Sequence, residues 1–374
     1  MTALTTSPAL PSTAKRPLLS LKTPGEILAA NFPAGHFFFD NRLWGRGLPL
    51  GVIGPPGIGK SRLVLQLVVS AVCQAPYLGL PCTWPSLRFL FLQAENSTAR
   101  LQQDLLSLKT ALTVQEWERF LRQVHFHTIE THLDSALNLS DHGNVSNIAE
   151  LIKAVAADVV IFDPLDPFAP GSLNSDSVMR TTLEQLSRLA KLGNPQAATI
   201  FVHHALTGTA GKSKATGFDR VGYAKGSKSF AAFLRGQINV FPRSSDDNTR
   251  LIVACGKNSN GPEFQPIGIV LNPATMLYDL DPEFDLAEWK DSQHTRPSSR
   301  TAVKPEDVAT LVQHLPMKRK ALVKELMDEF GCQKSAAYSA IDAALGKTIR
   351  FTDEKTIEAI PEVLEPADMP RPEA

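Results

Sequence analysis

The sequence predicts an α/β fold with a mainly parallel sheet flanked by helices, followed by a small helical unit. Three observations predict it: apolar runs that alternate with amphipathic stretches, a glycine-rich turn early in the chain, and a change of composition near residue 290. Strands that alternate with helices indicate a parallel sheet covered on both faces. With 374 residues, the chain is long enough for one large core and a small additional domain.

Strand and helix patterns alternate over the first two hundred residues. Apolar runs rich in β-branched residues predict buried strands at Leu50–Gly54, Arg88–Gln93, Val124–Ile129, Asp158–Asp163 and Ala198–His204. Helical patterns fall between them at Lys60–Cys73, Thr98–Thr110, Ser146–Ala156 and Val178–Lys191. Beyond these elements, GQINVF, RLIVACG and IGIVLNP predict short antiparallel strands that finish the sheet.

Composition also sets the expected domain boundaries. Residues 1–23 are rich in Ser, Thr and Pro and predict a disordered tail, and residues 24–288 hold the α/β domain. Residues 289–303 predict a polar linker, and residues 361–374 a second disordered tail. Residues 304–360 contain three short helical patterns and a brief strand pattern. They predict a winged helix-turn-helix whose second helix is Lys334–Leu345.

The bulk composition excludes some classes of protein. The 38 Lys and Arg residues balance 38 Asp and Glu residues, so any nucleic-acid-binding surface must be local. No apolar run reaches membrane-spanning length, and no membrane association is expected. The four cysteines are scattered without paired spacing, which favours reduced thiols and a cytoplasmic location.

The glycine-rich turn has the spacing of a phosphate-binding loop. GPPGIGKS, residues 54–61, fits G-x-x-x-x-G-K-S and lies between a predicted strand and a predicted helix. Its glycines let backbone amides point at an anion, and the helix start adds its positive dipole end. The alternative is a glycine-rich turn with an incidental Lys-Ser pair. The residues expected to bind ATP are Gly54, Pro55, Pro56, Gly57, Ile58, Gly59, Lys60, Ser61 and Arg62.

Lys60 would contact the β and γ phosphates, and the Ser61 hydroxyl would ligate Mg²⁺. Asp163 ends the apolar run VVIFD, where a carboxylate faces the crevice beside the loop and can hold Mg²⁺. The alternative for Asp163 is a turn residue before a proline. Glu95 follows the strand FLFLQ and is the candidate base that activates water, unless it is only an exposed acid near a helix start.

Two adjacent histidines, His203 and His204, close the strand ATIFVHH. An imidazole at this position can bond the γ-phosphate and report its loss to the following loop, and His204 is the preferred candidate. A structural role and a zinc site are the alternatives. The zinc site lacks cysteine or carboxylate ligands nearby in the sequence.

In this order, GPPGIGKS, FLQAEN, VVIFDPLDPF followed by Asn174, and ATIFVHH resemble the RecA-fold ATPases of the plasmid RepA-type replicative helicase group. The resemblance covers residues 24–281. It implies a RecA-like P-loop NTPase, a catalytic glutamate on the strand neighbouring the phosphate loop, and hexameric rings with ATP between subunits. It also points to Arg235 in GSKSFAAFLRGQ and Lys257 in ACGKNSNGP as cations that act in a neighbour's site. The related signature carries an arginine where this chain has Ser259.

The segment Thr207–Ser229 is expected to be a mobile loop that contacts single-stranded DNA. One acid, Asp219, stands among its five cations: Lys212, Lys214, Arg220, Lys225 and Lys228. A basic loop can follow phosphates by charge without reading bases, although it can also serve solubility alone. The C-terminal unit is expected to contact double-stranded DNA or a protein, with Lys334, Ser335 and Tyr338 near the start of its second helix.

The resulting expectation is an ATP-dependent DNA helicase or translocase that forms a ring and serves replication of a plasmid, phage or mobile element. The alternative is an ATP-switched DNA-binding regulator, or a recombination or assembly mediator that does not unwind DNA.

Overall fold

The structure is a computed structural model that describes residues 21–130, 137–206, 215–216, 219–244, 247–294, 303–313, 316–330, 334–352 and 356–360. The described residues form two compact units, one ending at Phe284 and the other beginning at Asp285. The predicted tails lie outside the described residues, apart from residues 21–23. No helix in the described part of the chain is long and apolar enough to cross a membrane.

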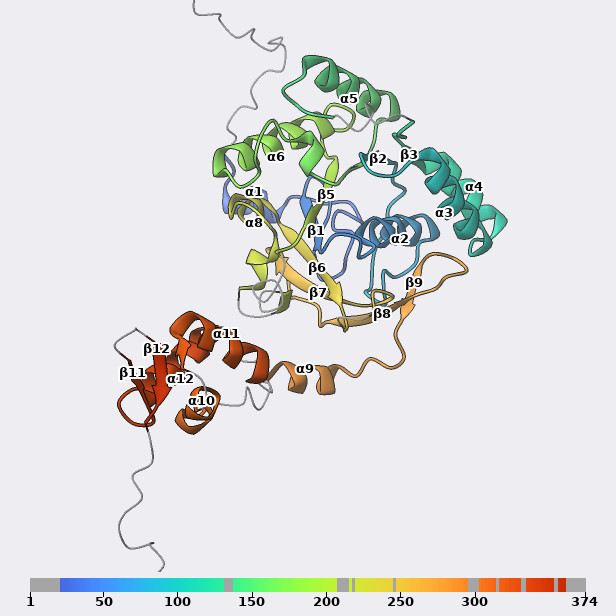
Figure 1. Cartoon of the computed structure of the whole chain (residues 1–374). Coiled ribbons are helices and arrows are strands. Elements are labelled where there is room, and N and C mark those ends of the chain that lie inside the picture. The colour runs from blue at the N-terminus through green and yellow to red at the C-terminus, as the bar shows by residue number, and fades with distance from the viewer. Residues whose placement is uncertain are drawn as a thin grey trace, which may run out of the picture. The chain divides into compact units, whose positions relative to one another are not determined.

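The first unit contains nine strands of one sheet (Figure 1). They are β1 (Pro49–Gly54), β2 (Phe89–Gln93), β3 (Val124–Phe126), β4 (Val159–Asp163), β5 (Ala198–His204), β6 (Gly236–Pro242), β7 (Arg250–Asn258), β8 (Ile267–Leu271) and β9 (Tyr278–Leu280). The order across the sheet is β3-β2-β4-β5-β1-β6-β7-β8-β9. Strands from β3 to β6 pair in parallel, and β7, β8 and β9 continue the sheet antiparallel.

The predicted α/β fold class is therefore confirmed, with one correction. GQINVF was predicted as antiparallel, but β6 pairs in parallel with β1 and antiparallel only with β7. The reason is that the connection between His204 and Gly236, which includes the helix Ser229–Phe233, is long enough for a crossover, so β6 can run in the same direction as β1. The reversal of direction comes one strand later, at the β6–β7 connection.

Helices cover both faces of this sheet (Figure 1). They are α2 (Lys60–Cys73), α3 (Thr98–Thr110), α4 (Val114–Gln123), α5 (His142–Val155), α6 (Asp176–Ala190) and α8 (Ser229–Phe233), with short 3₁₀ turns η2 (Asp166–Phe168) and η3 (Arg220–Tyr223). Helix α1 (Pro24–Leu28) has no buried residue. Helices α2 and α4 bury apolar side chains on one face, and α5, α6 and α8 do so on the other. This arrangement explains why the parallel strands are apolar throughout.

Helix starts follow ordinary capping chemistry. The Ser97 and Ser175 side chains accept backbone hydrogen bonds at the starts of α3 and α6, which satisfies donors that the helix cannot. Thr113 and Glu116 form a reciprocal capping box at the start of α4. Helix α2 instead has Gly59 as its N-cap residue, with a φ of +91° and no side-chain hydrogen bond to the helix. Its first amides are therefore left available for a ligand.

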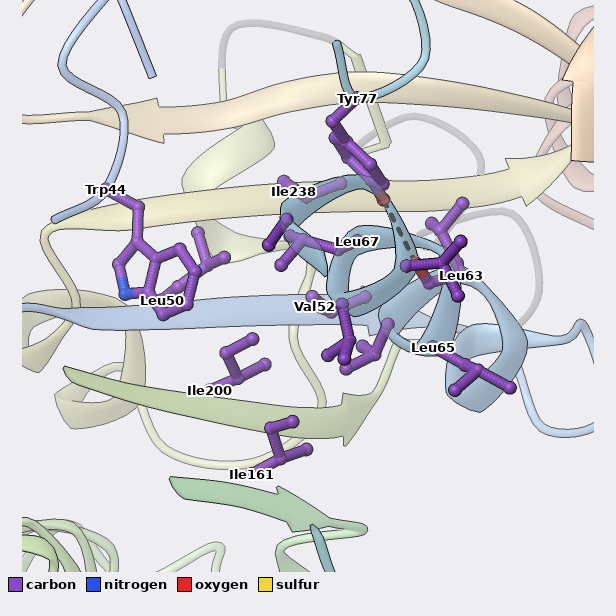
Figure 2. Packing of buried hydrophobic residues seen from close by; sticks show 14 of the residues in the cluster. Trp44, Leu50, Val52, Leu63, Leu65, Leu67, Tyr77, Ile161, Ile200 and Ile238 are labelled. Carbon is purple, nitrogen blue, oxygen red and sulfur yellow. Dashed lines mark hydrogen bonds between the residues drawn. The ribbon is translucent and has the colours of Figure 1, made fainter. Parts of the chain in front are cut away.

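The core beneath α2 joins four neighbouring strands (Figure 2). Val52, Ile161, Ile200 and Ile238, from β1, β4, β5 and β6, are buried together against Leu63 and Leu67 of the helix. The Tyr77 hydroxyl donates a hydrogen bond of 3.4 Å to the Leu63 carbonyl. These buried contacts fix α2, and with it the preceding turn, against the end of β1.

The second unit is small and has its own core. Its elements are α9 (Leu286–His294), α10 (Pro305–Val312), β10 (Met317–Lys318), α11 (Arg319–Phe330), α12 (Lys334–Ala344), β11 (Ile349–Phe351) and β12 (Thr356–Ala359). The three strands form an antiparallel sheet in the order β10-β12-β11. This arrangement is compatible with the predicted winged helix. Helix α9 occupies the first part of the predicted linker, and residues 295–302 lie outside the described residues.

Candidate nucleotide site

The predicted site residues from four strands meet at one edge of the sheet. The carboxyl ends of parallel strands lie at the same edge, where ligands bind in open α/β sheets. Gly54 at the end of β1 pairs with His204 at the end of β5. Asp163 at the end of β4 pairs with Gln93 at the end of β2, and Glu95 follows two residues later. The topology thus brings Lys60, Glu95, Asp163 and His204 together.

The phosphate loop has the backbone that its sequence predicts. Gly57 and Gly59 have φ angles of +72° and +91°, a region that favours glycine. At Gly59 a side chain would also meet the hydroxyl of Tyr278. Pro56 and Gly57 are exposed at the tip of the turn, whereas Ile58 is buried and anchors it. The loop is therefore fixed at its base and open at its tip.

Lys60 lies inside the turn, and only 7 % of its surface is exposed. Its Nζ donates a hydrogen bond of 2.8 Å to the carbonyl of Pro55. Burial lowers the pKa of the ammonium, while the negative charges of Asp163, Glu95 and Asp166 raise it. A buried cation surrounded by carboxylates and held by one carbonyl is suited to transfer its hydrogen bonds to a polyphosphate.

Asp163 is almost completely buried and accepts a hydrogen bond from the Ser61 side chain. Burial raises the pKa of its carboxyl to about 6, with the Ser61 hydrogen bond opposing this shift and the charge of Glu95 adding to it. An isolated carboxylate in such a place is costly unless a cation accompanies it.

The residues present fit Mg²⁺ bound with a nucleotide. The Ser61 hydroxyl and the Asp163 carboxylate are hard oxygen donors in contact, and a pocket beside them is also lined by Gln93 and Arg100. The buried Oε1 of Gln93 has no hydrogen-bond partner among the described residues. Among the residues that the structure describes, no group of three or more His, Cys, Asp or Glu could hold a metal ion by itself. Mg²⁺ does not need such a group, because it takes one or two protein ligands together with phosphate oxygens.

Glu95 follows β2, the strand that was predicted, but β2 does not neighbour β1, the strand that leads into the phosphate loop. The resemblance implied a glutamate on the strand neighbouring the phosphate loop, whereas β2 neighbours β4 and is separated from β1 by β4 and β5. Consecutive strands of such a sheet need not pair. The Ala94 amide donates 3.0 Å to the Asp163 carbonyl, which places the exposed Glu95 beside Asp163. Its charge acts on Lys60, Asp163 and His204.

His204 stands next to the first residue of the loop, because it pairs with Gly54 and is followed by Ala205, whose amide donates 3.0 Å to the Gly54 carbonyl. Burial lowers the pKa of the imidazole, and the positive charge of Lys60 lowers it further. Its Nδ1 is buried without a hydrogen-bond partner among the described residues. A neutral ring with an unused polar atom is available to a phosphate.

The structure does not bring Arg235 and Lys257 to this edge. The Arg235 amide donates 3.1 Å to the carbonyl of Pro49, at the opposite end of β1 from the loop. Lys257 pairs with Gln237 at the same opposite end, and its Nζ donates 2.8 Å to each of the Ala231 and Leu234 carbonyls. Arg62 is half-buried, and its Nη2 lies 3.7 Å from Oδ1 of Asp104 in α3. Its expected contribution to nucleotide binding is therefore through its backbone.

The basic segment Thr207–Ser229 is partly described. Lys212 and Lys214 lie outside the described residues, and the described part contains the 3₁₀ turn η3, where a loop was predicted. Buried amides on β6 hold it: Gln237 and Asn239 donate to the Arg220 carbonyl at 3.2 and 3.0 Å, and Asn239 donates 2.9 Å to that of Ala215. The Arg220 side chain forms an ion pair with Glu263. Lys225 and Lys228 are exposed.

Two residues that support the loop gave no signal in the sequence. Gln66 of α2 and the backbone of Tyr278 in β9 exchange two hydrogen bonds, of 2.6 and 2.7 Å. The Tyr278 hydroxyl reaches the carbonyl of Ile58 at 3.5 Å. The two residues are 212 positions apart in the sequence, so no local spacing could have paired them.

Comparison with known proteins agrees with this site. Residues 39–209, a little less than half of the chain, match the family described as AAA domain. A stretch of 79 residues is 40% identical to the DNA repair protein RAD51 homolog 2 of Arabidopsis thaliana, and the match spans 20% of each protein. The chain thus matches only about a fifth of this curated relative's length.

Solved structures with similar folds include a KaiC-like protein from the hyperthermophilic archaeon Pyrococcus horikoshii, with 13% identity and a TM-score of 0.43. The alignment covers 67% of this chain and 98% of that one. A second solved structure, described as an ATPase domain, has 11% identity and a TM-score of 0.46, over 69% of this chain and 95% of that chain.

Proposed function

We propose that this chain is an ATP-hydrolysing motor that acts on DNA: a ring-forming, cytoplasmic helicase or translocase that serves replication of a plasmid, phage or mobile element. The observation that carries the proposal is the meeting of Asp163, Glu95 and His204 around Lys60, at the strand end from which the basic segment departs. The match of residues 39–209 to the AAA domain family supports nucleotide binding. The local similarity to a DNA repair protein supports DNA as the partner.

Each residue has a role in this proposal. Lys60 and the backbone N–H groups of the non-proline residues among 54–62 would hold the phosphates, and Ser61 and Asp163 would hold Mg²⁺. Bound Mg²⁺ would neutralise the charge of the phosphates. Glu95 orients the attacking water and accepts its proton, and His204 contacts the γ-phosphate. Arg235 would complete the site of the next subunit in a hexamer, because its own loop lies at the other end of β1.

DNA would contact two surfaces. Exposed Lys225 and Lys228 of the basic segment would follow the phosphates of single-stranded DNA. The C-terminal unit would contact double-stranded DNA as a winged helix, with exposed Lys334 at the start of α12. Tyr338 is less available than the sequence indicated, since it packs on the core of that unit and the Arg319 guanidinium lies 5.4 Å from its ring centroid.

The test is ATP turnover by the purified full chain, with and without single-stranded DNA. We expect DNA to stimulate hydrolysis and Lys60→Ala to reduce it by at least about 100-fold, because a preorganised cation at developing charge is lost. Lys191→Ala, which removes an exposed lysine at the end of α6, is the matched control and should hydrolyse ATP normally. Unchanged turnover in folded Lys60→Ala protein would contradict the proposal.

A second candidate function is a recombination mediator that uses ATP without unwinding DNA, which the match to a RAD51 homolog favours. A strand-displacement assay separates the two. Unwinding of a forked duplex supports the helicase, whereas stable ATP-dependent DNA binding without displacement supports the mediator.

A further inference from the structure

His203 is the more buried of the two adjacent histidines, with 2 % of its surface exposed, and the proposed chemistry gives it no role. Three groups surround its ring. Nε2 lies 2.8 Å from the carbonyl oxygen of Lys225, and Nδ1 lies 3.3 Å from Oδ1 of Asp166. The ring of Phe230 packs against it at a centroid distance of 5.0 Å. These neighbours come from the basic segment, from η2 and from α8.

Both polar neighbours of His203 are hydrogen-bond acceptors. Because a carbonyl oxygen can only accept, the ring donates its Nε2 proton to Lys225. Nδ1 faces the carboxylate of Asp166, and the contact with the imidazole lowers the pKa of that carboxyl.

The Lys225 end of the basic segment is held to the phosphate edge by other bonds as well. Its amide donates 2.9 Å to the carbonyl of His204. Two residues later, the Ser227 amide donates 3.0 Å to Leu173, and the Ser227 hydroxyl donates to Asp176 at the start of α6. The His203 side chain adds one more hydrogen bond to these contacts. It belongs to β5, whose next residue, His204, pairs with the first residue of the phosphate loop.

We infer that His203 is a positioning residue that couples the nucleotide site to the basic segment, by holding the Lys225 backbone to the end of β5 next to the turn that carries Asp166. The inference rests on the proposed function, since it concerns the response of ATP hydrolysis to DNA. A displacement of β5 or of the turn after Asp163 reaches Lys225 through this side-chain hydrogen bond as well as through the backbone bond from Lys225 to His204. Without the side-chain bond, the site still binds and hydrolyses ATP, but the basic segment responds less.

Three substitutions separate the two polar contacts of the ring. His203→Gln keeps an N–H near the position of Nε2 and can still donate to Lys225. His203→Asn places its amide near the position of Nδ1 and cannot reach Lys225, and His203→Leu removes both polar atoms. We expect His203→Asn and His203→Leu to lose at least about fivefold of the DNA stimulation of kcat, the factor that one hydrogen bond represents. His203→Gln should keep it, and the DNA-free kcat and KM for ATP should change little in all three.

Partial tryptic digestion gives a readout that needs neither DNA nor turnover. In the wild type, a non-hydrolysable ATP analogue should change the rate of cleavage after Lys225. In His203→Asn and His203→Leu, the analogue should change the rate less than in the wild type, whereas His203→Gln should behave as the wild type. Thermal melting checks that each variant is folded, and the Gln and Asn pair still decides the question if His203→Leu does not fold.

The outcomes distinguish this inference from the proposed function. A wild type that hydrolyses no ATP contradicts the proposed function, and digestion still tests the role of His203. If ATP hydrolysis is present but His203→Asn and His203→Leu retain both DNA stimulation and nucleotide-dependent cleavage, the inference is wrong and the proposed function stands. If His203→Gln fails in the same way as His203→Leu, the bond to Lys225 is not the coupling contact, and the inference is equally wrong.

Discussion

Asp163 is a proposed ligand of Mg²⁺, and ionisation of its buried carboxyl lowers the stability of the folded protein. Its pKa, about 6, exceeds the ordinary value of 3.8 because the carboxyl is buried. Between about pH 4 and pH 6 the folded state thus binds more protons than the unfolded state, and stability falls as pH rises through this window. Above it, the cost is constant at about 1–3 kcal/mol.

Asp163→Asn removes this ionisation. We therefore expect the variant, without nucleotide and Mg²⁺, to have a higher free energy of unfolding than the wild type at pH 7.5, and no such advantage at pH 4. It should not hydrolyse ATP, and Mg²⁺ with nucleotide should stabilise it less than the wild type. Urea denaturation at the two pH values measures the difference. A variant that is less stable than the wild type at pH 7.5 would show that hydrogen bonds to the carboxylate outweigh its burial.

Local chemistry explains which residues the sequence could reveal. Lys60 and Ser61 belong to a continuous motif, and Asp163 and His204 follow apolar runs that had to be buried strands, so their meeting at one edge was predictable. The contact of Gln66 with Tyr278 was not, because it depends on how β9 packs against α2. The role of His203 depends likewise on where the basic segment returns, 22 residues later in the sequence.

Helix α8 connects the end of the basic segment to the opposite edge of the sheet, and hydrogen bonds hold both of its ends. At its start, the Ser229 amide donates 2.9 Å to the Ser227 hydroxyl, and at its end Lys257 donates to the Ala231 and Leu234 carbonyls. Five residues of helix are not stable by themselves, so these contacts and the buried Phe230 fix its position. Arg235 lies two residues beyond its last residue, Phe233.

This placement separates the roles of the two cations predicted to act in a neighbour's site. We expect Lys257→Met to cost about 1–2 kcal/mol of stability, because two carbonyls lose a charged donor. We expect exposed Arg235→Ala to cost less than about 0.5 kcal/mol. Both should lower ATP hydrolysis, Lys257→Met by releasing Arg235. Urea denaturation and ATPase assays of the two variants provide the check, and a Lys257→Met protein as stable as the wild type would leave Lys257 free to act directly on phosphate.

Helices with strong periodicity were predictable in their place along the chain, whereas their neighbours in space were not. The helices at Lys60–Cys73 and Thr98–Thr110 have the predicted bounds, whereas α5 begins at His142 and α6 at Asp176, before the predicted starts at Ser146 and Val178. Helix α4 was not predicted, although the Thr113–Glu116 capping box was a local sign of it. The separation of β2 from β1 and the parallel pairing of β6 arise from crossovers between distant segments, which a sequence pattern does not specify.

In the proposed mechanism, the first unit cannot complete its own site with Arg235. Strand β1 spans about 16 Å from Pro49 to Gly54, at about 3.3 Å per residue. Arg235 is anchored at the Pro49 end, so its side chain cannot reach phosphates held at the other end. A second copy of the chain that presents its Arg235 edge to this loop would supply the missing cation, which is the arrangement of a ring.

Mixed oligomers test this arrangement directly. Lys60→Ala subunits cannot hold phosphate but still carry Arg235, and Arg235→Ala subunits have an intact loop but lack the cation. We expect each variant alone to be nearly inactive, and a mixture to recover ATP hydrolysis, because sites form between the intact loop of one subunit and the Arg235 of the other. A maximum near one quarter of the wild-type rate is expected for equal, random mixing, since one interface in four combines both intact parts. Native mass spectrometry confirms that the subunits mix, and mixed oligomers without recovered activity would show that Arg235 does not act across an interface.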